Sequence, residues 1–195
     1  MDDFIGTQEP FRRLHGAVAV VEELERAVPG LASRRRPAPA GINWAAIEAD
    51  LGAGLPDDYT LLCELFPTFI LDDFLLVGGP QPGVESAWVQ RTLEELKIVT
   101  EWCADADLTV PLQPYPTVGG LLPWAASNEG DIFLWKTVPA DPQAWTVTIA
   151  SRNGGWWHYT GGAVQFLADL VSGAVEPWEL PRVCPEVSWL MEASA

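Results

Sequence analysis

The chain has 195 residues, 48% of them hydrophobic and ten of them tryptophan, which suits one folded domain with a sizeable core and excludes a disordered chain. Eleven basic residues against 27 acidic ones give a formal net charge of −16, which disfavours DNA and RNA binding because both polymers would be repelled. Residues 41–195 carry the whole imbalance, with five basic and 21 acidic residues, whereas residues 1–40 hold six of each. Such a surface would attract a basic partner, although acidity can also serve solubility alone.

The first 40 residues are predicted to form an appendage. Residues 10–28 have apolar side chains at helical spacing, and Pro29-Gly30 would end that helix. Residues 32–40 contain three consecutive arginines and two prolines, a composition typical of an exposed linker. We therefore expect an N-terminal helix and an Arg/Pro-rich linker at 1–40, followed by the main domain at 41–195.

The main domain is expected to begin with two short helices and a strand. Asn43 can cap the first helix, which glycines 52 and 54 would stop. Pro56 opens the second helix, where its missing N–H costs nothing, and acidic residues follow it at the positive end of the helix dipole. Pro67 would end that helix, and residues 71–77 are predicted to form one strand.

The later elements also follow from apolar spacing and turn residues. Residues 84–103 predict the longest helix, 121–126 and 131–137 a hairpin, and 145–149 a strand with one face exposed. A turn at Asn153-Gly154-Gly155 leads to a strand at 156–159, and residues 163–172 predict the last helix. The proline-rich tail from 176 to 195 is expected to be irregular and to pack back on the domain. Helices followed by hairpin-connected strands predict an α+β fold with a mostly antiparallel sheet and helices packed against it.

Two blocks of this pattern resemble the SUKH superfamily, the fold of the Smi/Knr-type immunity and cell-wall regulator proteins. The first block comprises Trp44, Ile47, Glu48, Leu51, Gly52, Leu55, Pro56, Asp58 and Tyr59. The second comprises Gly120 to Trp124, Asn128 to Asp131, Phe133 and Trp135, followed by Phe166, Leu167 and Gly173. The chain departs from the family at Phe66-Pro67, where members usually have a Tyr-Gly or similar turn. The resemblance covers residues 42–175 and implies a SUKH-like fold.

The sequence shows no targeting or membrane signal. Met1-Asp2-Asp3 is acidic where the n-region of a signal peptide would be basic, and no apolar run approaches the roughly 20 residues of a membrane helix. The three cysteines are widely spaced and form no Cys-x-x-Cys pair. A cytoplasmic protein without membrane association is the expectation.

No arrangement of residues indicates catalysis, a metal or a cofactor. A Cys63–His158 nucleophile pair is conceivable, but no flanking residue supports it. The oxygen-rich stretch at 128–131 lacks the spacing of a calcium loop and is better interpreted as a hairpin turn. Asp57-Asp58 starts a helix, and Asp72-Asp73 would point to opposite faces of a strand, so neither pair forms a proton-transfer site. We expect a non-enzyme with no cofactor and no metal.

The remaining candidate site is a protein-binding surface. Tryptophans are enriched in binding hot spots, and three of the ten lie in amphipathic or irregular segments where an exposed cluster rimmed by carboxylates would be a docking face. The partner-binding candidates are Asp72, Asp73, Glu129, Asp131, Trp145, Trp156 and Trp178.

The resemblance implies an immunity protein that binds and neutralises a cognate toxin of a bacterial polymorphic or contact-dependent toxin system. The acidic charge favours a basic protein as that partner. A regulatory scaffold of the same superfamily, acting in cell-wall or signalling control, is the alternative, and an enzyme of unknown type is the least favoured. The sequence does not identify the partner, the binding face or the oligomeric state.

Overall fold

The computed structural model describes residues 3–190 and is built on one mixed sheet of eight strands in the order β1-β7-β6-β5-β4-β3-β2-β8. Six pairs of neighbouring strands are antiparallel, and the remaining pair, β1 with β7, is parallel. The strands are β1 (Phe4–Gln8), β2 (Phe69–Leu71), β3 (Leu75–Val77), β4 (Leu121–Ser127), β5 (Ile132–Lys136), β6 (Thr146–Ala150), β7 (Trp156–Tyr159) and β8 (Val187–Trp189). The predicted α+β fold with a mostly antiparallel sheet is confirmed.

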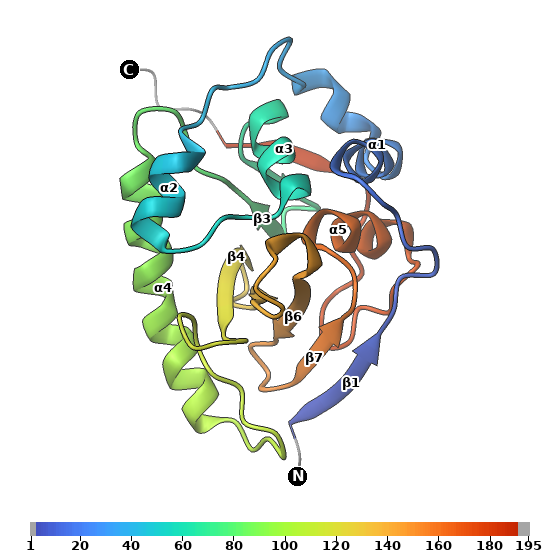
Figure 1. Cartoon of the computed structure of the whole chain (residues 1–195). Coiled ribbons are helices and arrows are strands. Elements are labelled where there is room, and N and C mark those ends of the chain that lie inside the picture. The colour runs from blue at the N-terminus through green and yellow to red at the C-terminus, as the bar shows by residue number, and fades with distance from the viewer. Residues whose placement is uncertain (1–2, 191–195) are drawn as a thin grey trace.

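Helices cover the sheet on both sides (Figure 1). The α-helices are α1 (Ala17–Ala27), α2 (Trp44–Leu51), α3 (Asp57–Leu65), α4 (Glu85–Asp105) and α5 (Ala163–Ser172), with short 3-10 helices at Pro29–Arg34 and Pro142–Ala144. One side carries α1, α3 and α5, which contact one another over the larger core. On the other side α4 packs against β4 and α2, and its second half closes a smaller core.

The helices of the segment 42–77 form as their sequence predicts. The Asn43 side chain accepts a hydrogen bond from the Ala46 N–H at 3.1 Å, and Gly52 ends α2 with a left-handed φ of 85°. Pro56 immediately precedes α3, whose Tyr59, Leu62 and Cys63 are buried. The strand that was expected at 71–77 is instead a hairpin, with β2 and β3 on either side of a tight turn.

The first 40 residues are not a separate appendage. Strand β1 extends the sheet beyond β7, and α1 packs against α3 and α5. Leu24, Val28 and Leu31 are all 0% exposed and belong to the same core as the residues after 41. The helix is also shorter than the predicted 10–28, because residues 10–16 form a loop that lies against α5 through Gln165.

The arginine-rich segment is exposed but tied to the domain. The Arg36 N–H donates to the Leu65 carbonyl at 2.8 Å, and its guanidinium donates to the Cys63 carbonyl at 3.0 Å. Both acceptors lie in the last turn of α3, where helix carbonyls lack partners within the helix. The segment that was expected to be a linker therefore packs against the C-terminal end of α3 and satisfies two of its carbonyl groups.

The second half of the chain follows its predicted order, with two corrections. Strand β6 has no exposed face: Thr148 is 0% exposed because neighbouring strands and the smaller core cover it. The tail contains β8, which pairs with β2 at the edge of the sheet, where an irregular segment was expected. Residues 191–195 of that tail lie outside the described residues. None of the helices at 3–190 is long and apolar enough to cross a membrane.

Candidate functional site

The β2–β3, β4–β5 and β6–β7 turns lie at one end of the sheet, because these strands alternate in direction. Hydrogen bonds join them into one surface. The Asn128 N–H donates to the Phe74 carbonyl at 2.9 Å, and the Arg152 N–H donates to Asp131 Oδ1 at 3.0 Å. We call this surface the turn end and define it as residues 72–74, 127–131 and 151–155 with the tail segment 179–187, whose Glu179 accepts the Gly155 N–H at 3.1 Å.

Asp72 and Asp73 lie in the turn between β2 and β3, not on opposite faces of a strand. Both have positive φ, 50° and 49°, and the Phe74 N–H donates to the Leu71 carbonyl at 2.9 Å. Aspartate tolerates this left-handed region better than most residues, and tight hairpins require it. Asp72 Oδ2 accepts the Cys184 N–H at 2.9 Å, and the Ser188 hydroxyl donates to Asp73 Oδ1 at 3.1 Å, so the tail fixes both side chains.

Only one of the two candidate carboxylates at the β4–β5 turn is on the surface. Asp131 is 2% exposed, and its carboxylate accepts hydrogen bonds from the Ser127 hydroxyl and the Arg152 N–H. It holds the β4–β5 and β6–β7 turns together and is not available to a partner, which corrects the prediction. Glu129 is exposed and forms an ion pair with Arg152 at 2.8 Å.

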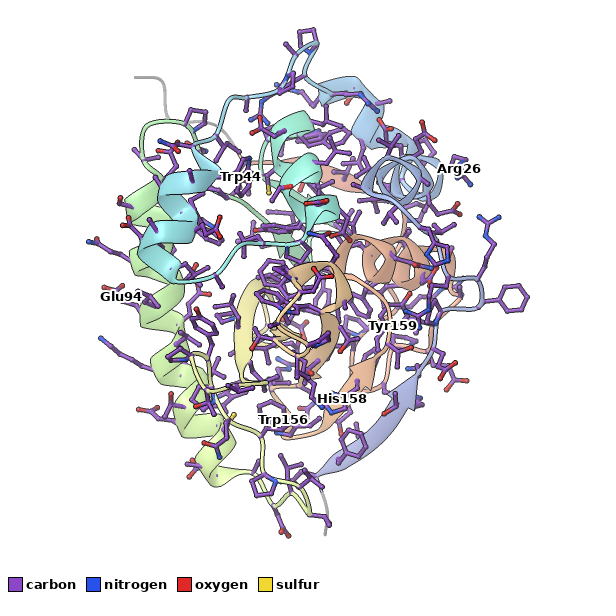
Figure 2. The ribbon with its side chains drawn as sticks, viewed as in Figure 1. Arg26, Trp44, Glu94, Trp156, His158 and Tyr159 are labelled. Carbon is purple, nitrogen blue, oxygen red and sulfur yellow. The ribbon has the colours of Figure 1, made fainter. Side chains whose placement is uncertain are left out.

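The predicted exposed tryptophan cluster is wrong. Trp145 and Trp156 are 4% and 2% exposed, and Trp156 lies inside the molecule (Figure 2), where it belongs to the smaller core with Val99 of α4. Trp178 is half-buried: its ring packs on Trp157 at a centroid distance of 5.6 Å, and its Nε1–H donates to Glu176 at 2.9 Å. These rings lie in the core because Trp156 belongs to a strand of the sheet, whereas the segments of Trp145 and Trp178 pack against the sheet.

The turn end nevertheless gathers more carboxylates than the sequence indicated. Glu179 and Glu186, both exposed, join Asp72, Asp73 and Glu129 there. Glu179 and Glu186 come from the proline-rich tail. The tail returns to the sheet through β8, and no pattern of neighbouring residues in the sequence predicts that return. The exposed arginines in the same segments are Arg152 and Arg182, and the first is already paired with Glu129. The surface is therefore net acidic and presents carboxylates from three separate stretches of the chain.

The structure does not bring Cys63 and His158 together. Cys63 lies in the larger core beside Tyr59, and burial raises the pKa of its thiol to about 12, which keeps it protonated and a poor nucleophile. His158 lies on the opposite face of the sheet, because its neighbours Trp157 and Tyr159 pack against Phe166 of α5. Within residues 3–190 no group of three or more His, Cys, Asp or Glu side chains could hold a metal ion.

His158 is expected to make stability depend on pH. Burial, and secondarily the nearby Lys136, lowers its pKa from 6.5 to about 4, while its Nδ1 shares a 2.9 Å hydrogen bond with Thr148. Because the folded pKa lies below the unfolded one, the stabilisation is present above pH 6.5 and is lost as pH falls towards 4. With solvent screening at this partly exposed ring, the loss should be about 2 kcal/mol.

The measurement is urea unfolding at pH 7 and at pH 4 for the wild type and for His158→Gln. The buried carboxyls of Asp58 and Asp169 have raised pKa values and act with the opposite sign, but they are common to both proteins. The difference between the two pH dependences therefore isolates His158. Equal pH dependences would show that the ring is not held neutral by its surroundings.

The turn end is a net acidic surface built from three stretches of the chain. It can form charge-assisted hydrogen bonds to lysine and arginine side chains. Several of its carboxylates are fixed in position because they accept hydrogen bonds from the Gly155 and Cys184 N–H groups and from the Ser188 hydroxyl. No family model matches the chain, and no curated protein matches it.

Proposed function

We propose that the protein is a non-catalytic binding protein that captures a basic protein partner through the turn end. The observation that carries the proposal is the convergence of Asp72, Asp73, Glu129, Glu179 and Glu186 on one end of a rigid sheet, in a chain of net charge −16. Complementary charge mainly raises the rate of association and selects the partner. Ordered carboxylates add specificity, since less side-chain freedom is lost when they bind.

The identity of the partner as a toxin rests on the resemblance of the sequence to the SUKH superfamily. In that role the protein would be a cytoplasmic immunity protein, and it would neutralise its toxin by covering or distorting a basic active cleft. A regulatory scaffold of the same superfamily is the alternative. It would bind several cell-wall or signalling proteins instead of one basic toxin.

The test is capture from a lysate of the source organism at low salt, with mass spectrometry of the retained proteins. A single basic protein that is released as salt rises supports the immunity function, and several signalling or cell-wall proteins support the scaffold. If no basic protein is retained, the proposal is contradicted.

Neutralising the turn end is expected to weaken that capture. The variant Asp73→Asn, Glu129→Gln, Glu179→Gln and Glu186→Gln removes four negative charges while its amides preserve oxygen acceptors for Ser188 and Gly155. Loss of four charge-assisted contacts should weaken binding by at least about tenfold.

The control removes the same charge elsewhere. Glu48, Glu94, Glu101 and Asp105 are exposed on α2 and α4, and within residues 3–190 their side chains have no hydrogen bond or ion pair. Glu94 points outward from α4 (Figure 2). Their amide variants should leave capture nearly unchanged. Equal losses in both variants would mean that overall charge, not the turn end, attracts the partner.

A further inference from the structure

One row of side chains crosses all eight strands on the α4 side of the sheet. The strand register aligns these residues as direct neighbours, and directly paired residues project from the same face. From one edge to the other the row is Ser188, Ile70, Leu76, Ala126, Ile132, Ala150, Trp156 and Phe4. Apart from the serine at its end, the row is apolar.

Helix α4 covers only half of this row. Val99 and Trp102, in its second half, pack with Ala150 and Trp156, which are 0% and 2% exposed. At the other half Leu76 is 38% exposed, and Ile70 and Ala126 are partly exposed. An apolar stretch of a sheet face that no helix covers is a common feature of docking sites.

A groove runs between this open half and the first half of α4. Its volume is about 380 Å³, and its lining includes Leu76, Pro123 and Ala126 from the sheet and Val84, Trp88 and Glu95 from the helix side. Trp88 is 8% exposed and lies deep in it, while Val84 and Leu190, at 53% and 48% exposed, are its most open apolar residues. The groove is thus apolar at its base and accessible at its rim.

The charges around the groove favour a basic occupant. Glu95 lies in its wall, where partial burial raises the pKa of the carboxyl, and within residues 3–190 no hydrogen bond or ion pair satisfies it. Arg91, one helical turn away, also lines the groove and lowers the pKa of Glu95 by less than burial raises it. The acidic excess near the groove therefore comes from the turn end. Asp73 and Glu129 of the turn end lie three residues along the strands from Leu76 and Ala126, roughly 10 Å away.

We infer that the open half of the row and the groove beside α4 dock a basic amphipathic helix of the protein partner, apolar side inward and lysines or arginines towards Glu95 and the turn end. The inference rests on the proposed function and names the element that the partner supplies. A helix suits this site better than a strand. The face of a sheet presents side chains and no free backbone donors, so an added strand could not form backbone hydrogen bonds there. It would lie beside α4 and complete the layer that α4 begins.

The probe is a synthetic leucine–lysine peptide of four helical turns, about 14 residues, with leucines on one face. A second peptide has glutamate in place of lysine. Binding of each labelled peptide to the full chain is measured by fluorescence anisotropy at about 0.15 M salt, where long-range attraction is largely screened. We expect the lysine peptide to bind and the glutamate peptide not to bind.

Two matched pairs of variants locate the site. Leu76→Gln changes a 38% exposed leucine in the groove, and Leu93→Gln changes a 40% exposed leucine of α4 that does not line it. Glu95→Gln and Glu94→Gln change adjacent carboxylates inside and outside the groove. We expect about tenfold weaker binding for Leu76→Gln and about threefold for Glu95→Gln, with the two controls within about twofold of wild type.

Equal binding by all four variants would overturn the groove as the docking site. Binding of the glutamate peptide as tightly as the lysine peptide would overturn the preference for a basic helix. If the lysine peptide does not bind while lysate capture retains a basic protein, the groove is wrong and the proposed function stands. If the peptide binds in the groove but no basic protein is retained, the inference about the surface stands and the proposed function fails.

Discussion

A chain that lacks residues 1–40 is expected not to fold. The deletion removes β1 and α1 and exposes the core surface beneath them. It also removes five buried apolar side chains: Val20, Val21, Leu24, Val28 and Leu31. At about 1.5–3 kcal/mol for each, their burial contributes about 7.5–15 kcal/mol of hydrophobic free energy, which is as large as the whole net stability of a typical domain. The fragment should show no cooperative unfolding transition by circular dichroism or tryptophan fluorescence.

Two single substitutions within the deleted segment provide the control. Leu24→Ala should cost about 2–5 kcal/mol, because the side chain is 0% exposed, whereas Phe11→Ala should cost less than about 0.5 kcal/mol at 94% exposure. A cooperative, native-like fragment 41–195 would contradict the structural role of the N-terminal segment. It would also support the prediction that this segment is an appendage separate from the main domain.

Phe166→Ala is expected to lose about 3–5 kcal/mol of unfolding free energy. Phe166 of α5 is 0% exposed and contacts four aromatic rings that line the sheet beneath it. Its centroid lies 5.4 Å from Tyr159, 5.8 Å from Phe133, 5.9 Å from Trp157 and 6.4 Å from Trp124. Truncation leaves a cavity that these large rings cannot fill by small movements.

The measurement is guanidinium unfolding of Phe166→Ala beside Phe166→Leu, which preserves most of the volume and should cost less than half as much. A second comparison is Val18→Ala, a 61% exposed position on α1, where we expect almost no change. A loss below about 1 kcal/mol for Phe166→Ala would show that the aromatic cluster is not the centre of the core.

The elements that the sequence predicted well carry their signals locally. The cap at Asn43, the stop at Gly52 and the two hairpins within residues 121–159 all depend on residues a few positions apart. Two errors are local, because the segment 71–77 is a hairpin and the first helix is shorter than predicted. The other main errors concern pairing between distant segments. Strand β1 pairs with β7 across about 150 residues of chain, and β8 returns to β2 from the far end. The residue pattern within β1 or β8 does not indicate which strand it pairs with.

The sequence predicted that the candidate site would be acidic, but it did not predict which residues form it. The acidic balance of residues 41–195 pointed to carboxylates, and Asp72, Asp73 and Glu129 do lie together. Asp131 is instead buried, because its carboxylate lies between two turns and accepts hydrogen bonds from the Arg152 N–H and the Ser127 hydroxyl, which need buried partners. Glu179 joins only through the fold of the tail. Which residues share this surface depends on the order of the strands in the sheet, and that order cannot be derived from local sequence patterns.

The most direct test of capture by the turn end is the rate of association with the captured basic protein as a function of salt. Steering by the carboxylates predicts that the association rate constant falls at least about tenfold between about 0.05 M and 0.5 M salt, with little change in the dissociation rate constant. The turn-end amide variant should begin with a slower rate and a flatter salt dependence than the variant of α2 and α4. An association rate that is flat across this range in the wild-type protein would contradict electrostatic capture.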